Sequence, residues 1–166
     1  MAETPAAKEK RATVHDTNKE SPTSSGEAMQ LHFTSLDGKE IELSELKGKL
    51  VIVDCWATWC RPCIAEFGNL KKMYEKYHSQ GLEVIGITMD EASAEPKVKE
   101  LVKQNKLPWP QFFEGRGFDQ NSFKQQYDIA ALPTVFMLDR QGRIIDRDAR
   151  GKRLEELITE NISQVK

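Results

Sequence analysis

Two cysteines three residues apart are the side chains in this sequence best suited to chemistry. Cys60 and Cys63 form a C-x-x-C pair within the stretch VIVDCWATWCRPC, residues 51–63. An apolar β-type run precedes the pair and a helical pattern begins at Ile64, so we expect the cysteines at a strand-to-helix junction. Thiols at this spacing can form and open a disulfide with little backbone movement. The pattern predicts thiol–disulfide exchange.

Cys60 is the expected nucleophile of the pair. At the start of a helix, unpaired backbone N–H groups and the positive end of the helix dipole stabilise a thiolate. Such positions lower a thiol pKa from ~8.5 to ~3.5–7.5. Arg61 adds a neighbouring positive charge, and Pro62 suits the first turn because its missing N–H would have no helical partner. We expect Cys60 to attack a substrate disulfide and Cys63 to resolve the mixed disulfide.

Asp54, six residues before Cys60, is a candidate base for Cys63. Burial in the apolar run would raise its pKa and let it exchange protons near neutral pH. Position alone leaves two interpretations open, a buried catalytic acid or a carboxylate that faces solvent at the end of a strand. Cys55, the third cysteine, is expected in the core without a redox role, since free cysteines are among the most buried residues.

Composition excludes several other classes of function. The chain has 166 residues, 39% of them hydrophobic and 30% charged, as expected for one soluble domain. A net charge of −2 offers no basic field for nucleic acid, and no apolar run approaches the ~20 residues of a membrane span. The cysteines lack a second ligand pair and the three histidines are isolated, so we expect no metal and no cofactor beyond the Cys60–Cys63 disulfide.

The order of patterns along the chain predicts an α/β fold. Residues 1–28 are polar and are expected to be a disordered leader, followed by one domain over residues 29–166. A hairpin with its turn at Asp37-Gly38 comes first, then a short helical turn capped by Ser44. The remaining expectations are strands at 51–57, 82–90 and 134–139, an extended connection at 107–113 that runs into a short strand, a hairpin partner at 143–149, and helices at 64–81, 93–106, 118–127 and 154–165. This order predicts a central mixed sheet flanked by helices.

Several motifs together resemble the thioredoxin superfamily. They are W-C-x-x-C, Asp54 and the Leu132-Pro133-Thr134 segment. The leading DGKEIELSELKGK hairpin, the VDCWATWCRPC block and the segment between LEVIGITMD and LPTVFMLD narrow the resemblance to the TlpA/ResA-type thiol-disulfide oxidoreductases. The resemblance covers about residue 29 to the end and implies a thioredoxin-like fold with an N-terminal hairpin and a central insert.

The resemblance also implies roles for individual residues. Cys60 would be the exposed nucleophile and Cys63 the buried resolving thiol. Pro133 would be a cis proline facing the pair, and Leu132 would bind the substrate backbone as a short added strand. Trp59 would pack beside the disulfide as part of the same substrate surface.

The resemblance further suggests which groups tune the disulfide. Asp54 falls where thioredoxins keep a buried acid, and Glu91 falls near an active-site carboxylate of ResA-type proteins. Glu91, Arg61 and Pro62 are therefore expected to tune the redox potential. The lysine that pairs with the thioredoxin acid would fall near Gly86, so that partner is missing from this sequence.

The sequence thus predicts a protein-disulfide oxidoreductase that acts as a reductase and as a monomer. Its partners would be protein thiols and disulfides and an electron-donating thiol–disulfide protein. The nearest alternative, a peroxiredoxin-like peroxidase, needs P-x-x-x-T-x-x-C, but Ala57 takes the place of the Thr and residues 51–59 contain no Pro. A non-catalytic thioredoxin-like binding module is the other alternative, and the intact C-x-x-C with Pro133 argues against it.

The expected location follows from the resemblance. Proteins of this type usually work outside the cytoplasm, often tethered by an N-terminal anchor. The sequence opens without a signal or anchor pattern. We therefore expect an exported, periplasmic domain of a longer protein whose leader is the remaining linker, whereas a complete chain would favour the cytoplasm.

Overall fold

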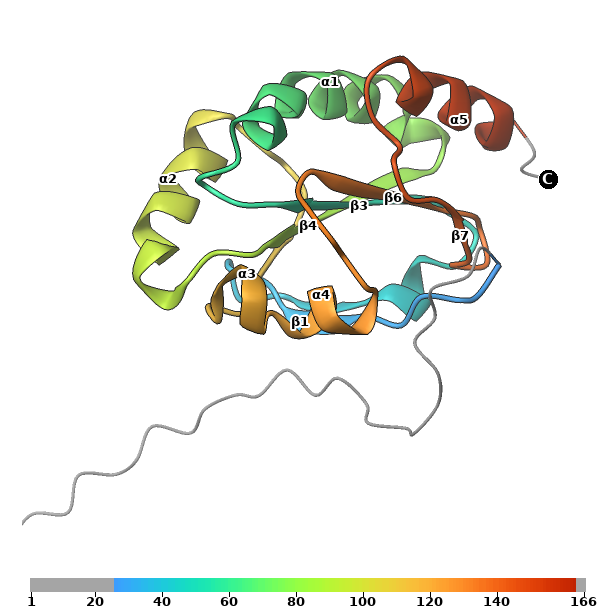
Figure 1. The fold of residues 1–166 in the computed structure, drawn as a ribbon. Coiled ribbons are helices and arrows are strands. Elements are labelled where there is room, and N and C mark those ends of the chain that lie inside the picture. Colours follow the sequence, from blue (N-terminus) through green and yellow to red (C-terminus); the bar gives the residue numbers. More distant parts are fainter. Residues whose placement is uncertain (1–25, 164–166) are drawn as a thin grey trace, which may run out of the picture.

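Strand β3 (Leu50–Trp56) forms the centre of the structure, and all seven of its residues are buried. The structure is a computed structural model that describes residues 26–163. Its main sheet has the strand order β5-β4-β3-β6-β7 (Figure 1). β4 (Leu82–Thr88) pairs with β3 in parallel, and β6 (Thr134–Leu138) pairs with it antiparallel. β5 (Gln111–Phe113) and β7 (Ile144–Asp146) form the two edges, so the predicted mixed sheet is confirmed.

Helices lie on both faces of this sheet. In Figure 1, α1 (Arg61–Tyr77) and α5 (Lys152–Ile162) cover one face, and α3 (Gly117–Gln120) and α4 (Ser122–Gln126) lie on the other. The hairpin of β1 (His32–Thr34) and β2 (Glu40–Glu42) also lies on this second face. The other elements are α2 (Glu95–Gln104) and the 3₁₀ turns η1 (Leu43–Leu46), η2 (His78–Gln80) and η3 (Ala92–Ala94).

The alternation of side chains along β3 decides which face receives each residue. Leu50, Ile52 and Trp56 belong to the apolar cluster that includes α1 and α5. Val51, Val53 and Cys55 belong to the cluster on the hairpin side. Since neighbouring strand residues point to opposite faces, Asp54 points toward the α1 face. Cys63 lies in that same cluster, so β3 directs Asp54 to the side of the cysteine pair.

The single helix predicted at residues 118–127 is wrong. Asn121 divides this segment, because its backbone is extended, with φ −66° and ψ 125°. Its side-chain oxygen accepts the Lys124 backbone N–H at 2.9 Å and caps α4. Asn is a preferred N-cap because its side chain replaces a missing backbone acceptor.

Three boundaries also differ from those predicted. The Ser44 cap is wrong, because η1 starts at Leu43 and has no side-chain cap bond. Within the segment predicted as a leader, Gly26 and Glu27 form backbone hydrogen bonds with Ile144. β7 ends at Asp146, three residues before the predicted end. Residues 1–25 of the predicted leader and Val165 of the closing helix lie outside the described residues.

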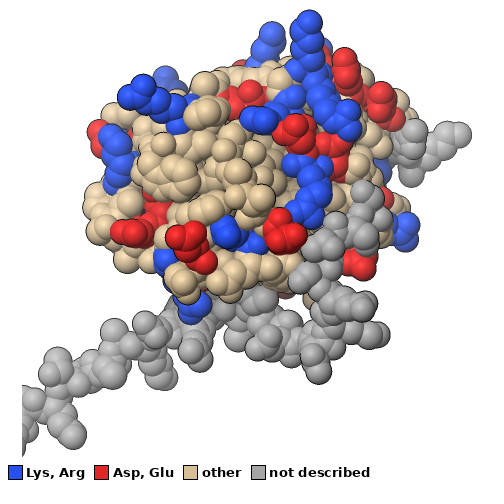
Figure 2. Space-filling view, in the orientation of Figure 1, with Lys and Arg blue, Asp and Glu red and all other residues tan. Residues whose placement is uncertain are grey.

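In Figure 2, charged side chains of both signs lie around the edge of the visible face, whereas its central part is largely uncharged. Among the helices of residues 26–163, none is long and apolar enough to cross a membrane.

Gly86 leaves room for a buried side chain from the neighbouring strand. It lies opposite Asp54 in the pairing of β3 and β4. A Cβ atom at residue 86 would lie only 2.0 Å from Gln111 Oε1. That oxygen accepts a hydrogen bond from Trp56 Nε1–H at 2.9 Å. Gln111 therefore fills the space that the thioredoxin lysine would need at position 86. This explains why the residue at that position is a glycine.

Gly86→Ala is expected to destabilise the fold by about 1–3 kcal/mol, because it displaces Gln111 and leaves the buried Trp56 N–H unpaired. Gly68→Ala is the matched control, since a Cβ at this helical position meets nothing within 4 Å. It should stabilise the protein by up to about 1 kcal/mol. Urea unfolding measures both. Equal effects of the two substitutions would contradict this role of Gly86.

Candidate active site

The two cysteines form a disulfide where strand β3 delivers the chain into helix α1. The S–S distance is 2.12 Å and the two Cα atoms are 5.3 Å apart. Cys60 is the N-cap of α1, and its Sγ atom accepts the backbone N–H of Cys63 at 3.3 Å. The predicted position of Cys60 at the helix N-terminus is therefore confirmed. A free backbone donor at this place stabilises negative charge on sulfur.

The two sulfur-bearing residues differ in accessibility. Cys63 is completely buried, whereas 5% of Cys60 is exposed. The expectation of an exposed Cys60 is thus corrected: in the disulfide form it is the more accessible partner, but it is largely covered. The cause is its place as the N-cap, where the preceding loop and the first helical turn both lie against it.

Asp54 is buried, and the alternative of a solvent-facing carboxylate is wrong. Only 1% of its surface is exposed, and its Oδ2 atom has no hydrogen-bond partner in the described part of the chain. Burial, together with the smaller effect of the nearby negative charge of Glu66, raises the pKa of Asp54 from 3.8 to about 8. A carboxyl group in this environment exchanges its proton near neutral pH.

Glu66 is a carboxylate that the sequence analysis missed. It lies one turn after Cys63 on α1, and its charge acts on Asp54. Its Oε1 atom accepts the backbone N–H of Gly151 and the side-chain N–H of Asn69, both at 2.8 Å. The available signal was helical spacing, because positions three apart lie on the same side of a helix.

Leu132 and Pro133 lie at the end of β3 from which the active-site loop departs. The peptide bond between them is cis, as the resemblance implied. Thr134 pairs with Cys55 across β6 and β3, so Pro133 falls level with Trp56. Leu132 and Pro133 are both partly exposed. The pairing of β6 with β3 thus brings residues 132–133 to the same end of the sheet as the loop to Cys60.

Trp59 is the exposed aromatic residue next to Cys60, with 58% of its surface accessible. Its ring meets Phe118 of α3 edge-on, with centroids 5.9 Å apart. The Lys124 ammonium lies 4.7 Å from the centre of the Phe118 ring. Phe118, in the segment between β4 and β6, therefore supports Trp59 from one side. The rest of the indole is open to a binding partner.

The three residues predicted to tune the potential lie in different surroundings. Arg61 and Pro62 are exposed in the first turn of α1, beside the disulfide. Glu91 is exposed after β4, where its backbone bridges to Arg116 and its side chain lies against Gly117. The charge acting on Asp54 comes from Glu66. The tuning role of Glu91 stays a prediction.

Asp90 holds the loop before the cysteines, and sequence analysis did not identify it. It is buried, with 2% of its surface exposed. Its carboxylate accepts the backbone N–H of Thr58 at 3.0 Å, the Thr58 hydroxyl at 2.6 Å and the Thr88 hydroxyl at 3.0 Å. Asp90 lies two residues after the end of β4, and its hydrogen bonds fix the backbone of Thr58, two residues before Cys60.

Cys55 is buried on the opposite face of the sheet from the disulfide. Burial raises the pKa of its thiol well above the usual value, which keeps it protonated and unreactive. The prediction of a core cysteine is confirmed. Within residues 26–163, no three His, Cys, Asp or Glu side chains cluster in a way that could hold a metal ion.

A family model described as the AhpC/TSA family matches residues 25–147. The chain belongs to this family. It is 34% identical over 139 residues to the thiol-disulfide oxidoreductase ResA of Bacillus thuringiensis, covering 84% of this chain and 76% of that protein. ResA of Bacillus subtilis is 29% identical over 148 residues, covering 89% and 79%. The chain is thus a ResA-type thiol-disulfide oxidoreductase, as its motifs predicted.

Solved structures of this family have the same fold. The thioredoxin domain of a thiol-disulfide oxidoreductase from Bacteroides vulgatus has a TM-score of 0.73 at 26% identity, covering 82% of this chain and 96% of that one. A thiol:disulfide interchange protein from Bacteroides sp. has a TM-score of 0.73 at 25% identity, covering 87% and 94%. The thioredoxin-like fold expected for this ResA-type protein is confirmed.

Asp54→Asn should stabilise the oxidised protein in a pH-dependent way. The folded state holds the Asp54 proton up to about pH 8, whereas the unfolded chain releases it near 3.8. The free energy of unfolding of the wild type therefore falls between these values, by up to about 1.4 kcal/mol per pH unit. The advantage of Asp54→Asn should grow from near zero at pH 4 to several kcal/mol at pH 8.

Urea unfolding of the oxidised protein at several pH values measures this difference. The control is Asp128→Asn, which changes an exposed carboxylate to a residue that tolerates the same positive φ of 51°. It should show no such trend. A constant difference between Asp54→Asn and wild type from pH 4 to pH 8 would show that Asp54 is already ionised in the folded protein.

Proposed function

We propose that this chain reduces disulfides of other proteins through a dithiol–disulfide cycle of Cys60 and Cys63. The observation that carries the proposal is the Cys60–Cys63 disulfide at the N-terminus of α1, with Cys60 as the more accessible partner. Membership of the ResA-type oxidoreductases supports the same chemistry.

The cycle starts from the reduced pair. The Cys60 thiolate attacks one sulfur of a substrate disulfide, which forms a mixed disulfide and releases the other substrate sulfur as a thiolate. The Cys63 thiolate then attacks Cys60 Sγ and releases the second substrate thiolate. The substrate gains two electrons, and the enzyme loses two as its own disulfide forms. A thiol–disulfide partner that donates two electrons returns the pair to the dithiol.

Asp54 is the group we propose to accept the proton of Cys63. Its carboxylate takes this proton as Cys63 attacks, so the disulfide product carries a neutral Asp54. The environment in the disulfide form suits this outcome, because burial keeps the carboxyl group protonated up to about pH 8. During reduction of the enzyme the proton returns from Asp54 to the departing Cys63 sulfur.

The substrate is proposed to lie across Trp59, Leu132 and Pro133. Trp59 offers an open aromatic face beside Cys60, and residues 132–133 lie at the same end of the sheet. The backbone of Leu132 would pair with an extended substrate segment as a short added strand. Arg61 and Pro62 in the first turn of α1, together with Glu91, would tune the potential of the pair.

The partners and location follow as proposals from family membership. Protein thiols and disulfides serve as substrates, and a second thiol–disulfide protein serves as the electron donor. The chain is proposed to act as a monomer outside the cytoplasm. A fusion to a reporter that is active only after export tests the location.

Reduction of insulin by dithiothreitol tests the cycle. Cys60→Ser should reduce catalysis to the uncatalysed rate, whereas Cys63→Ser should retain the first step and accumulate a mixed disulfide at Cys60, visible by mass spectrometry under non-reducing conditions. Cys55→Ala is the matched control, because this thiol lies on the other face of the sheet. It should keep wild-type turnover.

Two results would favour the alternative functions. Equal rates for wild type and Cys60→Ser, with neither above the uncatalysed rate, would leave only a binding module. Consumption of hydrogen peroxide at a rate comparable to insulin reduction would favour a peroxidase.

A further inference from the structure

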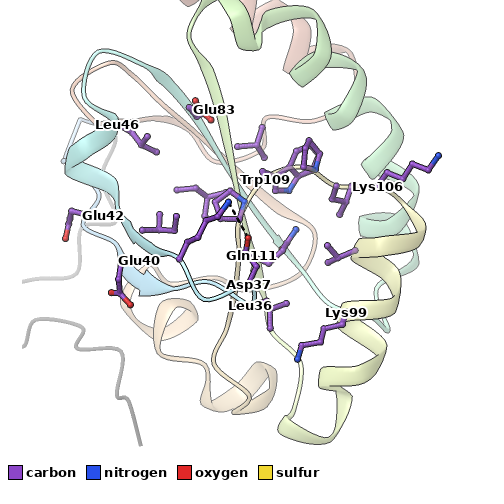
Figure 3. A pocket seen from close by; sticks show the side chains of 18 of the residues that line it. Leu36, Asp37, Glu40, Glu42, Leu46, Glu83, Lys99, Lys106, Trp109 and Gln111 are labelled. Carbon is purple, nitrogen blue, oxygen red and sulfur yellow. Dashed lines mark ion pairs between the residues drawn. The ribbon is translucent and has the colours of Figure 1, made fainter.

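A cavity of about 620 Å³ lies between the β1–β2 hairpin and α2, at the edge of the main sheet (Figure 3). Its walls come from the hairpin with η1, the first half of β4, α2, and the connection from α2 to β5. None of the proposed catalytic or substrate-binding residues lines it. The volume lies within the range of ~300–1,000 Å³ that is usual for sites of small ligands.

The cavity exists because the edge strand is short. β5 pairs with β4 only at Gly86–Thr88, so residues 82–85 of β4 have no strand on their outer side. The segment leading into β5 contains Pro108 and Pro110, which have no backbone N–H to continue the ladder. The chain therefore passes this part of β4 without pairing, and a hollow remains between it and the hairpin.

Apolar side chains form most of the cavity wall. Leu36, Ile41 and Leu46 contribute from the hairpin side, and Val102 and Leu107 contribute from α2 and the segment that follows it. Leu36, Ile41, Leu46 and Val102 are partly exposed. The Trp109 side chain lies between the hairpin wall and the α2 wall (Figure 3). Such a lining favours a mainly apolar ligand.

Two buried hydrogen-bond donors at this cavity have no acceptor. Trp109 and Gln111 both line it and are 4% and 3% exposed. Neither Trp109 Nε1 nor Gln111 Nε2 has a hydrogen-bond partner among the described residues. The amide of Gln111 is oriented by Trp56, whose Nε1–H donates to Gln111 Oε1. Unpaired buried donors are costly, so an acceptor that enters the cavity gains binding energy here.

The charges at the rim favour a neutral ligand. Glu40 and Glu42 lie on the hairpin wall, Lys99 lies on α2, and Lys106 lies on the connection that follows α2 (Figure 3). Five acidic and four basic residues line the cavity in all, so neither sign dominates. The two inner donors are themselves neutral, and burying an anion beside them would cost more than it gains.

We propose that this cavity binds a small, neutral, mainly apolar molecule through a carbonyl oxygen. The carbonyl oxygen accepts hydrogen bonds from Trp109 Nε1–H and the Gln111 amide, and the apolar body lies against Leu36, Ile41 and Val102. This site is separate from the disulfide and does not depend on the function proposed for it.

Propiophenone and propylbenzene test the proposal as a matched pair, because they differ only in the carbonyl group. Titrated into the ¹⁵N-labelled protein, propiophenone should shift the indole N–H signal of Trp109 saturably and leave that of Trp59 in place. The Trp109 signal is assigned by its loss in Trp109→Phe. Propiophenone should bind roughly 3–10-fold more tightly than propylbenzene, the gain expected for neutral hydrogen bonds.

Val102→Phe should fill the cavity and abolish the shift while insulin reduction continues at the wild-type rate. Leu157→Phe is the control, because it enlarges a partly buried apolar residue of another helix that does not line the cavity. The proposal is overturned if the Trp109 signal shows no saturable shift, if the shift persists in Val102→Phe, or if the ketone and the hydrocarbon bind equally. The ligand pair alone decides the question if Val102→Phe does not fold.

Discussion

The chemistry of this protein depends on the backbone position at which helix α1 begins. Because Cys60 is the N-cap, its sulfur receives the N–H of Cys63 at 3.3 Å and faces the positive end of the helix. Strand β3 and the Asp90–Thr58 hydrogen bonds fix the loop that leads to this cap. A helix that began one turn later would leave the same two cysteines without this stabilisation.

The burial of Asp54 disfavours negative charge on the Cys63 side of the pair, whereas the helix N-terminus stabilises negative charge at Cys60. Asp54 lies on the face of β3 that packs against α1, and the residue opposite it on β4 is Gly86, which carries no charge. The Gln111 side chain occupies the space that a side chain at position 86 would fill. Its Oε1 atom accepts a hydrogen bond from the Trp56 indole N–H. In the cycle proposed above, the Asp54 carboxylate accepts the Cys63 proton, and a pKa of about 8 lets it keep that proton when the disulfide forms. The helix N-terminus favours the Cys60 thiolate, and Asp54 is the group proposed to accept the proton of Cys63.

Local sequence patterns were sufficient for much of this account. The apolar run before Cys60 and the period of the following helix predicted the strand–helix junction, and the missing lysine at Gly86 was visible directly. Features that depend on packing between distant segments were not predictable. Glu91 follows the expected strand, yet Glu66 is the acid whose charge reaches Asp54. The break at Asn121 and the cavity beside Trp109 likewise depend on caps and edges that only the folded chain defines.

The redox potential of the Cys60–Cys63 pair tests the central claim most directly. We propose that the helix N-terminus and Arg61 stabilise the reduced thiolate and make the pair more oxidising, and that Asp54 acts in the opposite direction. Equilibration with glutathione buffers measures the balance. A reductase predicts a potential between about −270 mV, as in thioredoxin, and about −180 mV, as in protein disulfide isomerase. A value near −120 mV, typical of the strongest disulfide donors, would contradict the account.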